Sequence, residues 1–210
     1  MTDAATFWDK IAPKYAQDAI KDMAAYEYTL ERTKSYLNAD DRVLEMGCGT
    51  GSTALQIAPH VREMTGTDIS PVMTEIARTK AAAGGIKNVE FRVATAQDAA
   101  KLSGTFDAVL GFNLFHLLRA PEDIFDDVYA MLPKGGFFIT KTPCLNDKSV
   151  GLKRFAIKAM IPLMRMLGKA PYVGFFTQKE YDDALRFAGF EIVEAGNFPA
   201  ISRYVVAKRV

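Results

Sequence analysis

The stretch "DRVLEMGCGTGSTALQIA", from Asp41 to Ala58, decides the fold of this chain. It opens with a short apolar run typical of a strand and closes with residues at helical spacing. Gly47, Gly49 and Gly51 lie between the two at every second position. Glycines at this place let the backbone approach a ligand where a Cβ would clash, and a helix start adds aligned N–H groups. The alternative is that the glycines only form a tight turn.

Strands and helices alternate along the rest of the chain. The predicted strands are 42–47, 62–69, 89–95, 106–113, 137–142, 191–198 and 201–210. The predicted helices are 4–18, 24–37, 52–58, 70–83, 121–132 and 177–190. This alternation implies βαβ units and a mainly parallel sheet. The short loop through Pro199 predicts that the last two strands form an antiparallel hairpin at one edge. We expect one α/β domain, 1–210, with a helical cap at 1–39 and an inserted amphipathic lid at 146–176.

Composition excludes several classes of protein. The 210 residues carry 26 basic and 25 acidic side chains, and this balance gives no overall attraction to nucleic acid. The two cysteines, Cys48 and Cys144, have no metal-ligand spacing, and with two histidines in the chain we expect no metal site. The start of the chain does not resemble a signal peptide, and no apolar run is long enough to span a membrane. These features predict a soluble cytoplasmic protein.

Acidic residues beside the glycine loop narrow the choice of ligand. The spacing differs from the G-x-G-x-x-G of NAD sites, and no lysine follows Gly51 as in a triphosphate loop. Glu45 precedes the loop at the end of the strand, where it would repel a pyrophosphate and attract a cationic group. Asp68 ends the next strand and can accept hydrogen bonds from ribose hydroxyls. A ligand with a ribose, a cationic end and no phosphates fits, and S-adenosylmethionine is such a ligand.

An ordered set of motifs supports this interpretation. "VLEMGCGTG" and "GTDIS" are followed by "VEFRVATAQDA", "FDAVLGFNLFHLL", "LPKGGFFI" and "YDDALRFAGFEIVEA". Together they resemble the class I S-adenosylmethionine-dependent methyltransferases over about 40–145 and 177–210. The front segment "FWDKIAPKYAQD" is similar to the start of the ubiquinone/menaquinone-biosynthesis type. The resemblance implies a Rossmann-like, doubly wound, seven-stranded sheet.

The resemblance also implies which residues bind the cofactor. Glu45 orients the ammonium end, Asp68 holds the ribose diol, Ile69 packs on the adenine, and Asn113 lies beside the sulfonium. The full set is Tyr15, Glu45, Gly47, Cys48, Gly49, Asp68, Ile69, Thr95, Ala96, Gln97 and Asn113. Thr95 departs from the family, which commonly has an acid there to contact the adenine amine. Thr95, Gln97 or Asp98 must supply that acceptor.

Several of these residues also have purely structural interpretations. Asp68 can cap the following helix, although Ser70 is better placed, and Asn113 can simply form a turn. His116, just past the fourth strand, is a candidate general base or substrate contact, or a structural histidine. Four aromatic residues can line the mouth of the site or only pack: Trp8, Tyr15, Tyr26 and Tyr28. Because alignment of two reactants can contribute ~7–11 kcal/mol, we expect catalysis mainly by proximity.

The segment from Lys148 to Lys179 carries seven basic residues and no acidic residue. Within it, apolar and basic residues fall on different sides of a helix that Pro162 is expected to kink or break. Such a helix can be a lid with a solvated basic face, or it can lie at a membrane surface through 148–169. This predicts a small, lipophilic methyl acceptor, such as a quinone precursor or a phospholipid headgroup. The alternatives are a non-catalytic S-adenosylmethionine-binding module and a methyltransferase acting on protein or nucleic acid.

Overall fold

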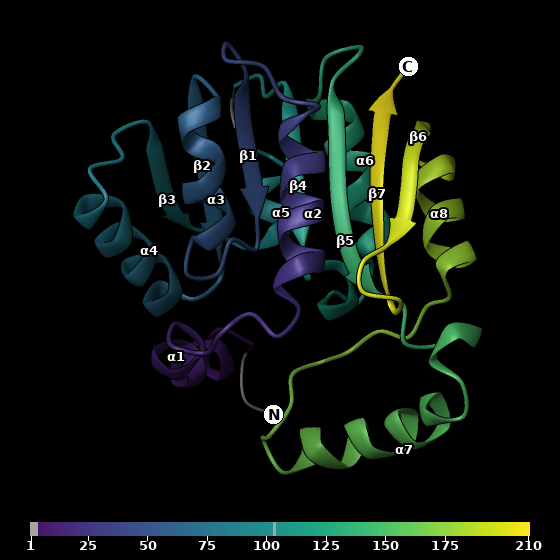
Figure 1. Ribbon diagram of the computed structural model, residues 1–210. Coiled ribbons are helices and arrows are strands. Elements are labelled where there is room, and N and C mark those ends of the chain that lie inside the picture. Colours follow the sequence, from purple (N-terminus) through teal and green to yellow (C-terminus); the bar gives the residue numbers. More distant parts are fainter. Residues whose placement is uncertain (1–3, 103) are drawn as a thin grey trace.

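The computed structural model describes residues 4–102 and 104–210, in which seven strands form one sheet with helices on both faces (Figure 1). The strands are β1 (Arg42–Met46), β2 (Glu63–Asp68), β3 (Val89–Val93), β4 (Ala108–Phe112), β5 (Phe137–Pro143), β6 (Phe190–Asn197) and β7 (Ser202–Arg209). Their order is β3-β2-β1-β4-β5-β7-β6. The first five strands run parallel, and β7 runs antiparallel to both β5 and β6. The predicted fold class, including the edge hairpin, is confirmed.

Helices cover the two faces of the sheet, so its inner strands are buried on both sides. The helices are α1 (Ala4–Tyr15), α2 (Met23–Lys34), α3 (Ser52–Ile57), α4 (Pro71–Ala83), α5 (Ala96–Ala99), α6 (Pro121–Met131), α7 (Lys153–Met166) and α8 (Gln178–Phe187). One core packs α5, α6 and α8 on the sheet, and the other packs α2, α3 and α4. Successive residues of β1, such as Val43 and Leu44, belong to opposite cores. The continuous apolar strands of the sequence reflect this double covering.

Side chains in the last turns of α2 and just after it tie this helix to the antiparallel hairpin. Arg32 and Tyr36 both donate hydrogen bonds to the carboxylate of Glu194 on β6. The hydroxyl groups of Thr33 and Tyr204 lie 3.1 Å apart in the buried interface between α2 and β7. The edge hairpin therefore supports a helix that contributes to the site described below.

Helix ends follow the signals in the sequence with a few exceptions. Ser70 caps α4 by accepting a hydrogen bond from the N–H of Met73, and Pro71 occupies the first turn. The helical turn α5 was not predicted, because four residues are too few for a periodic pattern. Pro162 lies inside α7 without ending it, so of the expected kink or break, the break does not occur. The predicted helix 177–190 is shorter, since Phe190 already begins β6.

The α1 and α7 helices lie below the edge of the sheet at which the parallel strands end (Figure 1). The proposed cap at 1–39 includes α1 and α2, while its first three residues lie outside the described residues. Within residues 4–102 and 104–210, no helix is long and apolar enough to cross a membrane.

Candidate active site

A cleft of about 620 Å³ opens at the carboxyl ends of the central strands, between them and the start of α2. This main cleft is lined by Tyr15, Ala16, Asp18, Ala19, Ile20, Lys21, Asp22, Ala25, Tyr26, Glu45, Gly47, Cys48, Gly49, Thr50, Ser52, Thr53, Phe112, Asn113, Lys141, Pro199 and Ser202. Five residues predicted to bind the cofactor lie here together: Tyr15, Glu45, Gly47, Cys48 and Gly49. Asn113 also lines the cleft, at the end of β4. This is the edge of a parallel sheet where ligands bind.

The glycine loop has a backbone conformation that residues other than glycine rarely adopt. Gly47 and Gly49 have φ angles of +66° and +53°. A Cβ on Gly49 would have only Tyr15 Cε1 nearby, at 3.9 Å, so the space above this residue is open. A Cβ on Gly47 would lie 2.9 Å from Leu114 Cδ1. Both glycines line the cleft, and the open space at Gly49 agrees with the predicted approach of a ligand to the loop, which stays a prediction.

Glu45 places a buried carboxyl group at the bottom of the main cleft. Its side chain is 2% exposed, and Oε2 has no hydrogen-bond partner among the described residues. Burial raises its pKa to about 8, and the charge of Asp68 adds to this, while the backbone N–H of Ala54 acts in the opposite direction. A buried carboxylate without a partner is costly, so this site favours either a proton or a cationic ligand group.

The Asp68 carboxylate fixes the glycine loop by accepting hydrogen bonds from two backbone N–H groups. Its Oδ2 accepts a hydrogen bond from the N–H of Gly49 at 2.9 Å, and its Oδ1 accepts one from the N–H of Ser70 at 2.9 Å. Burial raises its pKa, and these two hydrogen bonds counteract the effect. Because Ser70 itself caps α4, the cap interpretation of Asp68 is not needed. Each carboxylate oxygen retains a lone pair that a ribose hydroxyl can use.

The α1 helix is attached beside this carboxylate. Asp9 accepts hydrogen bonds from Ser70 Oγ at 2.5 Å and from the N–H of Val72 at 3.2 Å. This attachment brings Tyr15, at the end of α1, over the glycine loop. The Trp8 ring meets the Tyr15 ring edge-to-face with centroids 6.4 Å apart, so Trp8 packs behind Tyr15 and does not line the cleft. Tyr28 instead packs on Phe198.

The segment expected to contact adenine follows β3 and lies outside the lining of the main cleft. Thr95 caps α5, accepting a hydrogen bond from the N–H of Asp98 and donating one to its carboxylate. Ile69, Ala96 and Gln97 are likewise absent from the lining residues. Their assignment to the cofactor stays a prediction. The Thr95 hydroxyl oxygen already accepts a hydrogen bond from the Asp98 N–H, whereas the Asp98 carboxylate has more free lone pairs for an amine.

Asn113 and His116 differ in their relation to the cleft. Asn113 adopts a left-handed conformation with φ of +56°, so it both forms the turn after β4 and lines the cleft. His116 lies on the 3-10 turn η2 (Phe115–Leu117), and its Nδ1 is 3.2 Å from Thr142 Oγ1. Burial lowers the His116 pKa to about 4, so its ring is neutral. His116 does not line the main cleft, and its catalytic role stays a prediction.

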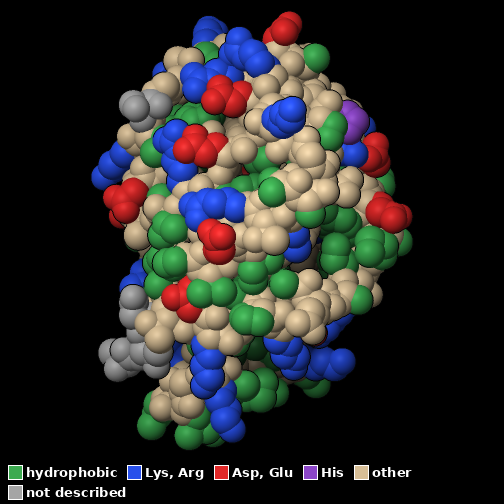
Figure 2. All heavy atoms as spheres, turned by 90° about the vertical axis from the view of Figure 1, so that its left-hand side faces the viewer, with side chains coloured by type: hydrophobic (Ala, Val, Ile, Leu, Met, Phe, Trp, Pro, Cys, Tyr) green, Lys and Arg blue, Asp and Glu red, His purple; other side chains and the backbone are tan. Residues whose placement is uncertain are grey.

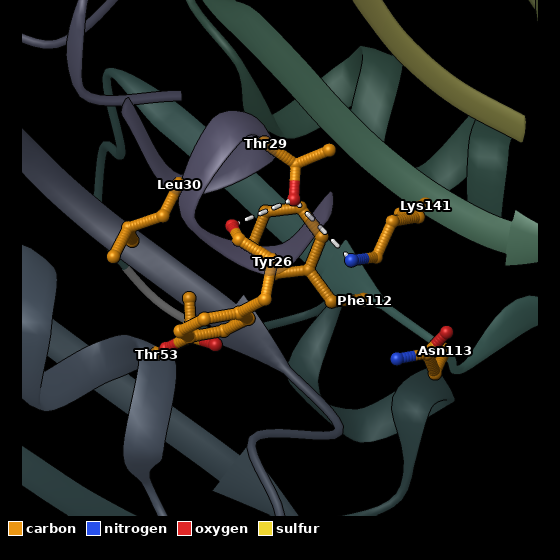
Figure 3. Close-up of a pocket in the computed structure, with 7 residues that line it drawn as sticks. All are labelled: Tyr26, Thr29, Leu30, Thr53, Phe112, Asn113 and Lys141. Atoms are coloured by element: carbon orange, nitrogen blue, oxygen red, sulfur yellow. Dashed lines mark hydrogen bonds between the residues drawn. The ribbon is translucent and has the colours of Figure 1, made fainter. Parts of the chain in front are cut away.

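Sequence reasoning missed Lys141, which projects from β5 into the same cleft (Figure 3). Its side chain is buried, and Nζ donates a hydrogen bond to Thr29 Oγ1 at 3.3 Å. The signal was present in "FFITKT", where one lysine interrupts an apolar strand at its carboxyl end. Asp22, which caps α2 and lines the cleft, was also missed, because its role depends on where α2 packs.

The residues of the main cleft fit S-adenosylmethionine. The unpartnered carboxyl oxygen of Glu45 matches an ammonium group, and the open space above Gly49 accommodates the ligand without a Cβ clash. Asp68, at the end of the adjacent strand, retains acceptor capacity for a ribose. The described residues include no cluster of His, Cys, Asp or Glu suited to a metal ion.

Comparison with known proteins identifies the class. A family model described as "Methyltransferase domain" matches residues 8–195, and the chain belongs to this family. The resemblance to class I S-adenosylmethionine-dependent methyltransferases is thereby confirmed, and with it S-adenosylmethionine as the cofactor.

Three similar proteins share between 15% and 30% of their aligned residues with this chain. The ubiquinone biosynthesis O-methyltransferase of Ruegeria pomeroyi is 30% identical over 159 residues, which cover 75% of this chain and 62% of that protein. The chain thus spans less than two thirds of this relative. Geranyl diphosphate C-methyltransferase from Streptomyces coelicolor has a TM-score of 0.71 at 15% identity, covering 90% of this chain and 79% of that one. The cyclase SpnF has a TM-score of 0.69 at 18% identity, covering 90% and 80%. These two structures establish the fold.

Proposed function

We propose that this protein is an S-adenosylmethionine-dependent methyltransferase that acts on a small molecule. The observation that carries this proposal is the buried Glu45 carboxyl group, which faces the glycine loop with one oxygen unpartnered. A cationic amino-acid end is the ligand group that satisfies it. Asp68 would hold the ribose, and the Gly47 and Gly49 backbone would follow the methionine part.

The bound cofactor supplies an activated methyl group on a sulfonium, and the chain itself supplies alignment. Glu45 and the glycine loop fix one end of the ligand, while Asn113 at the end of β4 would limit where the methyl group points. Tyr15 on α1 lies beside Gly49 and would close over the bound cofactor. Holding the reactants in this way can contribute ~7–11 kcal/mol to lowering the barrier.

The acceptor is proposed to be lipophilic. A second cleft of about 590 Å³ lies between α1, the turn after β4 and the end of α7, with Phe7, Leu117 and Met166 among its apolar walls. Arg119 and Arg165 line the same cleft, and both guanidinium groups lie against the Tyr172 ring, 4.8 and 5.2 Å from its centre. No acidic side chain is among its lining residues, so it suits an apolar molecule with an anionic group. The name of the Ruegeria relative, which refers to ubiquinone biosynthesis, agrees with such an acceptor.

The α7 helix is proposed to rest on a lipid surface and to close over the acceptor. No residue of α7 is buried, and Leu163 and Met166 are 57% and 85% exposed. Figure 2 shows hydrophobic and basic side chains gathered at the lower end of the molecule, where α7 lies in Figure 1. The absence of acidic residues from 148–179 favours an anionic surface. A lid packed against the protein alone would hide these side chains.

The first test is turnover. Purified protein with S-adenosylmethionine and a lipophilic metabolite extract should form S-adenosylhomocysteine, and calorimetry should show S-adenosylhomocysteine binding. Binding without turnover on any extract would favour the alternative, a non-catalytic binding module. The cyclase SpnF shares the fold, so fold alone does not decide this point. The balanced overall charge argues against a nucleic-acid substrate.

A further inference from the structure

Lys141 is a buried lysine to which the proposed binding of the cofactor assigns no role. It is 8% exposed, and the only hydrogen bond of its side-chain nitrogen among the described residues is the long one to Thr29 Oγ1. No ion pair to it is formed within 4–102 and 104–210. Together with Tyr26, Phe112 and Asn113 it lines a recess of about 40 Å³ that continues the main cleft (Figure 3). Burying an ammonium group without a carboxylate is unfavourable, so this site favours either loss of the Lys141 proton or an anionic ligand group.

Sheet order places Lys141 on the acceptor side of the cleft. Asp68 and Glu45 end β2 and β1, so the ribose and the methionine part belong over those strands. Asn113 follows β4, and its N–H donates a hydrogen bond to the Lys141 carbonyl on β5 at 2.6 Å. In the order β3-β2-β1-β4-β5, β5 is the next strand beyond the methyl group. Register pairs Glu45 with Leu110 and Leu110 with Ile139, so Lys141, two residues on, lies on the same face as Glu45.

From this geometry we propose that Lys141 is a catalytic residue that binds the methyl acceptor, and that the acceptor carries an acidic hydroxyl group of the phenol or enol class. The inference rests on the proposed function, and in it the reacting hydroxyl group of the acceptor lies in the main cleft at Lys141 while the second cleft would hold the apolar remainder of the molecule. Neutral Lys141 Nζ takes the hydroxyl proton and becomes an ammonium ion that pairs with the acceptor oxygen. A bond then forms between that oxygen and the methyl carbon, and the carbon–sulfur bond breaks with its electron pair remaining on sulfur. A phenol, with a pKa of about 10, matches a lysine in acidity, whereas an aliphatic alcohol does not.

The surroundings of Lys141 make its ammonium group easier to deprotonate than that of an ordinary lysine. Burial lowers its pKa, and the negative charge of Asp22 opposes this effect. The titratable groups that line the cleft around it are Tyr15, Asp18, Lys21, Asp22, Tyr26, Glu45 and Cys48. On the neighbouring strand, Tyr204 of β7 is its register partner and directs its hydroxyl group to Thr33.

The test uses 4-nitrocatechol, a phenol whose absorption moves to longer wavelength when its hydroxyl group ionises. S-adenosylhomocysteine affinity is measured first by calorimetry on the wild type, Lys141→Met and Lys80→Met. Lys80 is the matched control, because its Nζ also bonds a threonine hydroxyl, Thr50 Oγ1 at 3.0 Å, and burial also lowers its pKa. The nitrophenol is then added to each S-adenosylhomocysteine complex at a pH below the probe's first ionisation.

We expect the wild type and Lys80→Met to bind the probe in its ionised, red-shifted form. Lys141→Met should bind it about 10- to 150-fold more weakly and without the red shift, with unchanged S-adenosylhomocysteine affinity. Lys141→Arg keeps a cation but takes no proton, so it should bind the ionised probe with release of one proton to the buffer, whereas the wild type keeps this proton on Lys141. If Lys141→Met is unstable, this arginine variant decides the question.

Three results overturn the inference. The first is a wild-type complex that does not bind the nitrophenol, and the second is an equal red shift in Lys141→Met. The third is a loss of S-adenosylhomocysteine affinity in Lys141→Met, which would assign the lysine to the cofactor carboxylate. Failure of the wild type to bind S-adenosylhomocysteine at all would instead contradict the proposed function.

Discussion

Replacing Glu45 by Gln should stabilise the ligand-free protein at alkaline pH and weaken cofactor binding. In the folded protein the Glu45 pKa is raised to about 8 from 4.5. Between these two values the folded state holds a proton that the unfolded chain releases, so stability falls as pH rises through this window. The shift of about 3.5 units corresponds to a loss of up to about 5 kcal/mol between pH 4.5 and pH 8. Glutamine keeps the shape of the side chain without the charge, so the variant should lack this loss.

The affinity for S-adenosylhomocysteine should rise with pH, whereas the stability of the ligand-free protein falls. An ammonium group next to Glu45 favours its carboxylate form, so S-adenosylhomocysteine binding below pH 8 should release a proton. In the wild type, affinity should therefore increase with pH until Glu45 is ionised in the free protein. Glu45→Gln should lose this dependence and, at pH 8, bind about 10- to 150-fold more weakly, the effect of one hydrogen bond to a charged group.

The assay is chemical unfolding at pH 5 and pH 8, together with calorimetry of S-adenosylhomocysteine in two buffers that differ in ionisation enthalpy. Glu27→Gln, at an exposed position of α2, is the control and should match the wild type in both measurements. The reasoning is refuted if wild type and Glu45→Gln lose stability equally between the two pH values and bind the ligand with equal affinity.

Three further predictions concern other parts of the site. Asp68→Asn should bind S-adenosylhomocysteine about 10-fold or more weakly by calorimetry and also melt earlier, because the carboxylate holds the N–H groups of Gly49 and Ser70; unchanged affinity would exclude a ribose contact. His116→Ala should retain S-adenosylhomocysteine affinity and most of its turnover if catalysis depends on proximity, whereas a loss of about 100-fold in turnover alone would identify His116 as a general base. Leu163→Glu, at an exposed position of α7, should leave the melting temperature unchanged and reduce co-sedimentation with anionic vesicles about 10-fold; equal sedimentation would contradict the lipid contact.

The sequence predicted the part of the site that depends on local chain order. The glycine loop, Glu45 and Asp68 lie within one βαβ unit, so strand ends and loop spacing were enough to bring them together. Lys141, Asp22 and Ser202 were missed, since they reach the cleft through the packing of α2 and the hairpin against distant strands. No local pattern encodes such contacts. For α7, helical spacing indicated an apolar side, but only the structure shows that this side is exposed rather than buried.

The connection between α2 and the β6–β7 hairpin affects the order in which the protein becomes competent to bind. A ribosome makes the glycine loop early and the hairpin late, and domains mature in this direction during synthesis. Until Glu194 and Tyr204 are available, Arg32, Thr33 and Tyr36 lack the partners that fix α2. The growing chain therefore possesses its ligand loop well before the opposite wall of the cleft is secured. A nascent chain stalled before Glu194 should therefore bind S-adenosylhomocysteine only weakly. Tight binding should begin once β7 has been synthesised.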